Sequence, residues 1–252
     1  MRLDNYLVEI NYFDSRTKAK QSIERGEIFI EGKIVSKPSY YIDNNTQPKI
    51  ERVFIDSFVS LGGFKLNKAI NELGISVNNK ICIDIGASTG GFTDCLLQHG
   101  AKKVYAVDLN DSLLHPSLKN NERVTPIIKN VKNLKKADFD DKIDLIVADL
   151  SFISITQAIP IISDLLDNDE QAVLLIKPQF ETNLKRNFKN GIIRDKKIQI
   201  EACKNAYNVA SQEGLFVTGF TTTEINSQKN LEILMSFIKN GVNKISIDEI
   251  NF

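Results

Sequence analysis

Short apolar segments rich in β-branched residues alternate with helical segments over most of this chain, and this alternation constrains the fold more than any other feature. Five segments are predicted strands: 80–85, 103–108, 124–129, 145–148 and 171–176. Helical patterns such as 91–98 and 155–166 separate several of them. Strands that are apolar throughout and joined by helices form parallel sheets that are covered on both faces. The sequence therefore predicts an α/β domain with a Rossmann-like sheet.

The end of the chain continues this pattern with one ambiguity. Residues 196–213 are expected to form a last long helix, and 215–223 to return as a strand. Residues 231–237 fit either a helix or a strand, and we expect an antiparallel strand. The predicted sheet is therefore mostly parallel, with an antiparallel last strand.

Composition limits the kinds of protein this chain can be. Its 32 basic and 32 acidic residues give a formal charge of zero, which excludes an overall basic nucleic-acid binder but not a local basic face. Three cysteines without a CxxC pair, and only two histidines, argue against a disulfide scaffold and against a metal site. No N-terminal signal is visible, and Asp149 and Pro160 interrupt the most apolar window, 145–166. We expect a cytoplasmic protein that uses no metal and no membrane.

A polar, turn-forming stretch at 43–48 divides the chain. Before it, a helical spacing at 2–10, a second helix from Asp14 or Ser15 to before Gly26, and a hairpin at 28–35 predict a small α+β unit. We assign residues 1–43 to this unit, 44–57 to a linker and 58–252 to the α/β domain.

The small unit is basic in its middle. Between residues 15 and 37, six basic residues outnumber three acidic ones, and on charge alone a solvated helix face is the better explanation. The pattern is more specific than charge, however. It resembles an S4 RNA-binding domain in Arg2-Leu3-Asp4, Leu7, Ser15-Arg16, Ala19, Ile23, Gly26, Ile28, Ile30, Gly32 and Lys37-Pro38. The resemblance implies contact with structured RNA, and the candidate residues are Arg2, Arg16, Lys18, Lys20, Arg25 and Lys37.

A glycine-rich loop at 83–94 follows a predicted strand and opens a helix. Its glycines allow a tight turn and a close approach of the backbone to a ligand. The spacing is neither GxGxxG nor a P-loop; it resembles motif I of Rossmann-like methyltransferases, which bind S-adenosylmethionine. Asp108 ends the next strand, 24 residues after Asp84, where a carboxylate can accept both ribose hydroxyls. The predicted cofactor-binding residues are Asp84, Gly86, Ser88, Gly90, Gly91, Phe92, Asp108, Asn130 and Asp149, with turn capping as the alternative for Asn130.

Charged residues follow two predicted strands at the edge where parallel sheets place their sites. Asp149 comes after the strand at 145–148, and Lys177 after the strand at 171–176. A lone strand-end lysine is more often structural, but two neighbouring strands that end in Asp and Lys direct both side chains into one crevice. Lys65 and Glu232, taken alone, would be surface charges.

Taken together, these residues resemble the TlyA, or hemolysin A, family of ribosomal RNA 2′-O-methyltransferases over the whole chain. The resemblance is carried by Arg2-Leu3-Asp4, Val59-Ser60, Lys65-Leu66, Asp84-Ile85-Gly86, Ser88-Thr89-Gly90-Gly91-Phe92, Val107-Asp108, Asp149-Leu150-Ser151-Phe152-Ile153-Ser154, Lys177-Pro178-Gln179-Phe180-Glu181 and Gly191-Ile192-Ile193-Arg194-Asp195. It implies a methyltransferase fold and a Lys-Asp-Lys-Glu catalytic set at Lys65, Asp149, Lys177 and Glu232. It also implies methylation of cytidine ribose in ribosomal subunits, with 23S and 16S RNA both open as substrates.

Two other functions remain alternatives at this point. The older family name leaves a membrane-damaging hemolysin, against which the absent signal and membrane span argue. A ribosome-binding protein without activity is the second, and the intact Lys-Asp-Lys-Glu set argues against it.

A second basic segment follows the candidate Lys177. Residues 180–197 carry six basic and two acidic residues, on a loop that contains Gly191. A solvated loop and a clamp on RNA phosphates explain the pattern equally well. The candidate RNA-binding residues here are Lys185, Arg186, Lys189 and Arg194.

Overall fold

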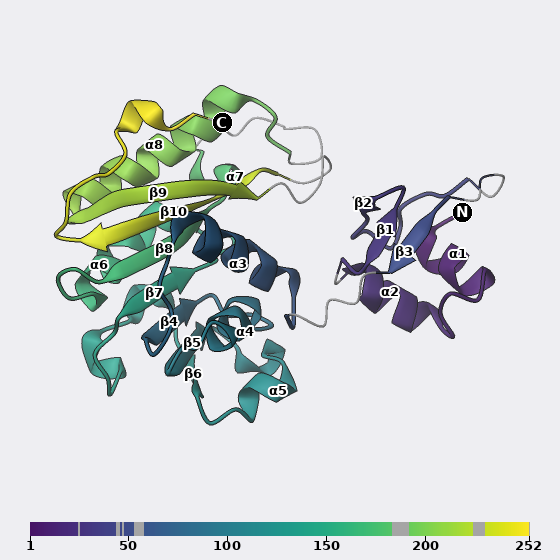
Figure 1. The fold of residues 1–252 in the computed structure, drawn as a ribbon, viewed down its shortest axis with the longest axis horizontal. Coiled ribbons are helices and arrows are strands. Elements are labelled where there is room, and N and C mark those ends of the chain that lie inside the picture. The colour runs from purple at the N-terminus through teal and green to yellow at the C-terminus, as the bar shows by residue number, and fades with distance from the viewer. Residues whose placement is uncertain are drawn as a thin grey trace. The chain divides into compact units, whose positions relative to one another are not determined.

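The chain forms two compact units, Met1–Leu61 and Gly62–Phe252, in a computed structural model (Figure 1). The structure describes residues 1–24, 26–43, 46, 48–52, 58–182, 192–223 and 230–251. Each unit has its own apolar core.

In the N-terminal unit, two helices and a three-stranded sheet share one core. Helices α1 (Leu3–Glu9) and α2 (Arg16–Glu24) bury Leu7 and Ile23 against Ile28 of the sheet. The predicted hairpin is confirmed, because β1 (Ile28–Ile30) pairs antiparallel with β2 (Lys33–Ile34).

The sheet of this unit extends beyond the predicted domain end. Strand β3 (Ile50–Arg52) lies within the predicted linker 44–57 and pairs antiparallel with β1, so that Ile50 stands opposite Ile30. Ile50 also packs against the core of the unit. The polar stretch that suggested a linker is therefore followed by a third strand of the same sheet.

The second unit is built on a seven-stranded sheet in the order β6-β5-β4-β7-β8-β10-β9 (Figure 1). Strands β6, β5, β4, β7 and β8 are parallel, and β10 is antiparallel to both of its neighbours, which confirms the predicted mixed sheet. The ambiguous segment 231–237 belongs to strand β10. The strand bounds are β4 Ile81–Ile85, β5 Lys103–Asp108, β6 Val124–Ile128, β7 Leu145–Ala148, β8 Gln171–Ile176, β9 Leu215–Thr223 and β10 Glu232–Lys239.

Helices cover the sheet as its apolar strands require. Ile83 of β4 belongs to the core cluster that includes Ile159 of α6 (Ile159–Leu165) and Ala206 of α8 (Lys196–Gln212). Successive strand residues point to opposite faces, so Asp84 faces the other side, where it contacts α4 (Gly91–Gln98). In the described ranges this unit also contains the α-helices α3 Leu61–Leu73, α5 Pro116–Lys119 and α7 Pro178–Glu181.

Candidate active site at the carboxyl edge of the sheet

Asp149 and Lys177 meet because they follow adjacent parallel strands. Strands β7 and β8 are paired in register, with Ala148 opposite Leu174. Asp149 directly follows the last residue of β7, and Lys177 directly follows the last residue of β8; both strands end in a run of buried residues. Lys177 Nζ lies 2.6 Å from Asp149 Oδ1 as an ion pair, and the Lys177 side chain is only 9% exposed.

Lys65 and Glu232 join this pair from distant parts of the chain. Lys65 lies on the first turns of α3, and Glu232 is the first residue of β10. Lys65 Nζ lies 2.6 Å from Glu232 Oε2 and 3.9 Å from Asp149 Oδ2. The four side chains therefore alternate in charge, from Lys177 through Asp149 and Lys65 to Glu232. Two positive and two negative groups balance, so their partial burial leaves no net buried charge.

Three residues near Lys177 belong to the sequence motifs, but the sequence assigned them no role of their own. They are Ser151, Phe152 and Phe180. Lys177 Nζ donates a hydrogen bond of 2.9 Å to the Ser151 hydroxyl. Phe152 is 92% exposed with a left-handed backbone, φ 66°, and its ring contacts that of Phe180 at 5.7 Å between centroids. An aromatic residue in this conformation is uncommon, and such backbone strain gathers at functional sites.

Glu181 ties the two loops of the site together. Its carboxylate accepts hydrogen bonds from the Ser154 hydroxyl and, at 2.8 Å, from the Ile155 amide. Burial raises the pKa of Glu181 above its ordinary value. The loop after β7 and the segment after β8 are thus joined at Asp149–Lys177, at Phe152–Phe180 and at Ser154–Glu181.

The glycine-rich loop lies against the same edge. Gly86 has φ +85°, and a Cβ there would lie 2.5 Å from the carbonyl oxygen of Asp149. Gly90 has φ +92°, and a Cβ there would lie 2.2 Å from Leu118 Cδ1. These glycines were expected for a tight turn and for close approach to a ligand. The positive φ values fit the tight turn, and the packing of the loop against its own protein adds a second reason for glycine.

Three other predicted cofactor residues support the loop from within the core. Asp84 is fully buried, and Oδ2 accepts a hydrogen bond of 2.6 Å from the Thr93 hydroxyl. Burial raises the pKa of Asp84 to about 7. Phe92 is buried, and Gly91 is the first residue of α4. None of these three residues is among those that line the adjacent pocket.

A pocket opens beside the loop, between the ends of β5 and β6. The fit of S-adenosylmethionine can be tested at Asp108, whose Oδ2 accepts from the Ser88 amide at 2.8 Å and Oδ1 from the Leu109 amide at 2.7 Å. A carboxylate oxygen has two acceptor sites, so each oxygen keeps one for a hydroxyl donor, and Asp108 fits the ribose of the cofactor. Ser88 and Asp108 were predicted; the pocket is lined by Ala87, Ser88, Ala106, Asp108, Asn110, Asp111, Leu114, Pro126 and Ile127.

Asn130 is not among the residues that line this pocket. It precedes the 3₁₀ turn Val131–Asn133, and its side chain accepts a hydrogen bond of 3.0 Å from the Lys132 amide. This is the turn-capping role that the sequence left as the alternative.

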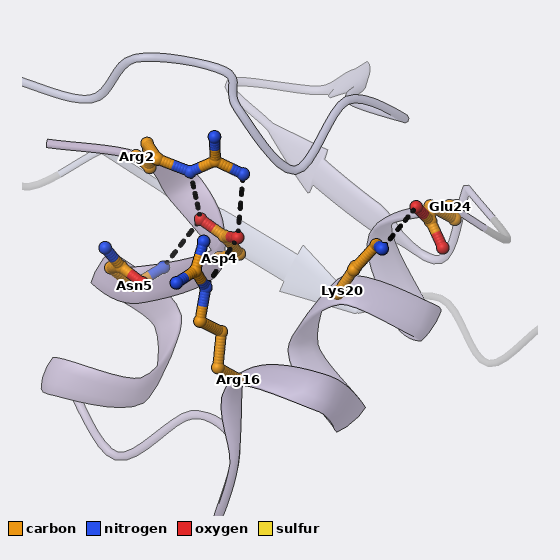
Figure 2. Close-up of polar contacts among 6 residues, drawn as sticks. All are labelled: Arg2, Asp4, Asn5, Arg16, Lys20 and Glu24. Carbon is orange, nitrogen blue, oxygen red and sulfur yellow. Dashed lines mark hydrogen bonds and ion pairs between the residues drawn. The ribbon is translucent and has the colours of Figure 1, made fainter.

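The N-terminal unit presents two arginines that are held by one buried carboxylate (Figure 2). Asp4 accepts from Arg2 Nε and Nη2, both at 3.0 Å, and from Arg16 Nε at 2.9 Å. The Asp4 side chain is 1% exposed, whereas Arg2 and Arg16 are 47% and 58% exposed. These guanidinium groups hold the pKa of Asp4 down at about 2, against an ordinary 3.8. The arginines are thereby fixed at the surface.

The other predicted RNA-binding residues are less constrained or lie outside the described residues. Lys18 pairs with Asp14 at 2.8 Å and Lys20 with Glu24 at 3.7 Å, on the exposed face of α2. Lys37 and Arg194 are exposed. The predictions for Arg25, Lys185, Arg186 and Lys189 fall outside the described residues.

None of the helices in the described ranges is long and apolar enough to cross a membrane. Comparison with known proteins matches both units of the chain. An FtsJ-like methyltransferase family model matches residues 58–239, more than half of the chain, and an S4 domain model matches residues 1–46.

Individual relatives match over nearly the full length. Hemolysin A of Brachyspira hyodysenteriae is 45% identical, over 94% of this chain and 100% of that protein. The 23S rRNA (cytidine-2′-O)-methyltransferase TlyA of Campylobacter jejuni is 31% identical, over 95% of this chain and 100% of that protein. A solved structure from Streptococcus thermophilus, described as a hemolysin, is 33% identical with a TM-score of 0.75, and covers 99% of this chain and 94% of that one.

Proposed function

The chain belongs to the TlyA and hemolysin A group of FtsJ-like methyltransferases that carry an S4 domain, and from this premise we propose that it methylates the ribose 2′-oxygen of a cytidine in ribosomal RNA. The observation that carries the proposal is the alternating set Lys177, Asp149, Lys65 and Glu232, in which the backbone of Asp149 lies against Gly86 of the glycine-rich loop. This arrangement supports the proposal of a proton acceptor beside the loop that would hold the methyl donor.

Lys177 is proposed as the general base. Methyl transfer to a hydroxyl requires the oxygen to be aligned with the methyl group and its proton to be accepted. The Lys177 amine can take that proton, and Asp149, 2.6 Å away, then stabilises the ammonium that forms. Lys65 is proposed to position the ribose, and Glu232 to hold Lys65 in place through their ion pair.

The pocket beside the loop is the proposed site of S-adenosylmethionine. When S-adenosylmethionine is bound, the methyl group on its sulfonium is the electrophile. Asp108 is proposed to accept the ribose hydroxyls of the adenosine, and Ala106, Pro126 and Ile127 provide an apolar wall for its base. Gly86 keeps this loop in contact with the backbone of Asp149, so the cofactor loop and the proton acceptor share one edge of the sheet.

RNA docking is proposed to begin at the S4 domain. Arg2 and Arg16, both fixed by Asp4, present guanidinium groups that match the geometry of phosphate. Lys18, Lys20, Arg25 and Lys37 add positive charge, and the basic segment 185–194 is proposed to contact phosphates near the active site. Near Lys177, the exposed ring of Phe152 offers a surface on which an unstacked base can lie.

Mapping the methylated nucleotide tests this proposal. Purified 30S and 50S subunits are incubated with the protein and methyl-labelled S-adenosylmethionine, and the labelled ribose is located by blocked primer extension and mass spectrometry. We expect label at a cytidine 2′-oxygen and none with Lys177→Ala. Label on a base nitrogen or carbon, or no transfer to either subunit, would overturn the assignment.

A further inference from the structure

We infer that Ser151 is a positioning residue that, together with Asp149, fixes the direction of the Lys177 lone pair. The inference rests on the proposed function of Lys177 as general base. It concerns a residue whose hydroxyl contacts Lys177 rather than the reacting oxygen.

The geometry of a primary amine carries the argument. Lys177 Nζ lies 2.6 Å from Asp149 Oδ1 in an ion pair, and it donates a hydrogen bond of 2.9 Å to Ser151 Oγ. A neutral lysine amine is tetrahedral, with Cε, two hydrogens and one lone pair around the nitrogen. When the two hydrogens point to the two acceptors, the lone pair occupies the only remaining direction. With Asp149 alone, only one hydrogen has a fixed direction. Rotation of the amine can then exchange the positions of the lone pair and the second hydrogen.

The same arrangement accounts for the proton after transfer. The ribose O–H bond breaks as the oxygen–methyl bond forms, and the proton joins the Lys177 lone pair. The resulting ammonium keeps its ion pair with Asp149 and its hydrogen bond to Ser151, with the new N–H in the third direction. Solvent then takes up this proton before the next turnover. No rearrangement of Asp149 or Ser151 is needed at any step.

Ser151 is well placed to be tested separately from folding. Ser151 is exposed. Within the described residues, its hydroxyl makes one hydrogen bond, which it accepts from Lys177. The loop around it is held independently, by Glu181 at Ser154 and Ile155 and by the contact between Phe152 and Phe180. Removing the hydroxyl should therefore change the orientation of the Lys177 amine and leave the loop in place.

The test compares Ser151→Ala with Ser151→Thr, which keeps a hydroxyl. Single-turnover methylation is measured at saturating cofactor and subunit. Ser151→Ala should react roughly tenfold more slowly, the effect of one orienting hydrogen bond, with unchanged cofactor and subunit affinities. Ser151→Thr should recover a rate within about threefold of wild type. Ser211→Ala is the matched control, because the Ser211 hydroxyl has no hydrogen-bond partner in the structure's described part.

The outcomes separate this inference from the proposed function. A wild-type protein that transfers no methyl group to either subunit defeats the proposed function itself. Active wild type with an equally fast Ser151→Ala defeats the inference alone. A Ser151→Thr enzyme as slow as Ser151→Ala defeats it too, as does a rate loss that follows weaker subunit binding, because either result assigns Ser151 to something other than the amine.

Discussion

Lys65 Nζ lies 2.6 Å from Glu232 Oε2, although α3 precedes the first strand of the sheet and β10 is the last strand. Both side chains are less than one-fifth exposed, at 13% and 15%. Glu232 is oriented by strand β10, whose antiparallel pairing with β8 puts its first residue at the edge where β8 ends. The ion pair therefore joins the first helix of the domain to its last strand at the candidate site.

The Lys65–Glu232 pair should be strongly coupled. Removing Glu232 leaves Lys65 partly buried, with Asp149 as its remaining negative neighbour at 3.9 Å, so Glu232→Gln should lower both stability and methyl transfer. A double-mutant cycle with Lys65→Gln should give a coupling free energy of about 1–3 kcal/mol in urea unfolding. The exposed pair Lys136–Asp167, 2.7 Å apart, is the control and should give less than about 1 kcal/mol. Equal coupling in the two pairs would show that burial of the site pair has no consequence.

Lys177→Ala should lose roughly 10²–10⁴-fold in single-turnover rate, the usual contribution of a general base, while it still binds cofactor and subunit. Lys177→Arg should fail as well, because a guanidinium does not give up its proton near neutral pH. Calorimetry of cofactor binding checks that each variant has an intact pocket. The base assignment is wrong if the arginine enzyme works within a few-fold of wild type.

Asp108→Ala should weaken S-adenosylmethionine binding by about 1.5–3 kcal/mol, since it removes a charged acceptor of hydrogen bonds. Titration calorimetry measures the affinity, and circular dichroism checks the fold, because Asp108 also accepts from the Ser88 and Leu109 amides. Asn130→Ala is the comparison. Its side chain caps a turn, so its loss should cost far less affinity. A larger effect at Asn130 than at Asp108 would restore Asn130 as an adenine contact and contradict the proposed contact of Asp108 with the cofactor.

Asp4 should make the N-terminal domain sensitive to acid. Its pKa is about 2 in the fold and 3.8 ordinarily, so ionised Asp4 stabilises the fold above pH 3.8, and this stabilisation is lost as pH falls toward 2. Asp4→Asn should be about 2 kcal/mol less stable than wild type at pH 7, and the difference should shrink between about pH 4 and pH 2. Hydrogen exchange of the α1 amides at each pH follows this domain. Asp14→Asn, at a side chain that is 86% exposed, should show a much smaller change.

Arg2 and Arg16 should contribute to RNA binding through phosphates. The double variant Arg2→Gln/Arg16→Gln should bind more weakly to the ribosomal subunit that serves as substrate. It should also reduce the slope of log affinity against log salt by roughly one unit per lost contact. Filter binding over a salt series measures the slope, and cofactor affinity should not change. Lys136→Gln, an exposed lysine of the methyltransferase domain, is the control for a general loss of charge. A slope that stays at the wild-type value would exclude phosphate contacts at these arginines.

Much of the fold was determined by the sequence alone, because local patterns specify local structure. The fully buried run of β7 and the alternating pattern of β9 were recognisable as strands, and α4 begins and ends at its predicted residues, Gly91 and Gln98. The pairing of Asp149 with Lys177 also followed from the sequence, since parallel strands end at one edge. Strand β3 was missed because three residues after a polar stretch give little periodic signal. These residues form a strand through their pairing with β1, which the local sequence does not indicate.

The tertiary structure decided what depends on distance rather than on pattern. The family resemblance grouped Glu232 with Lys65, but no local pattern does so, and their ion pair forms because the sheet order brings β10 beside β8. The burial of Asp84 beneath the loop, the capping role of Asn130 and the hydrogen bond from Lys177 to Ser151 also belong to this class. A sequence shows which residues carry charge and where strands end. Only the packed sheet sets which oxygen lies within 3 Å of which nitrogen, and that spacing controls the chemistry of the amine.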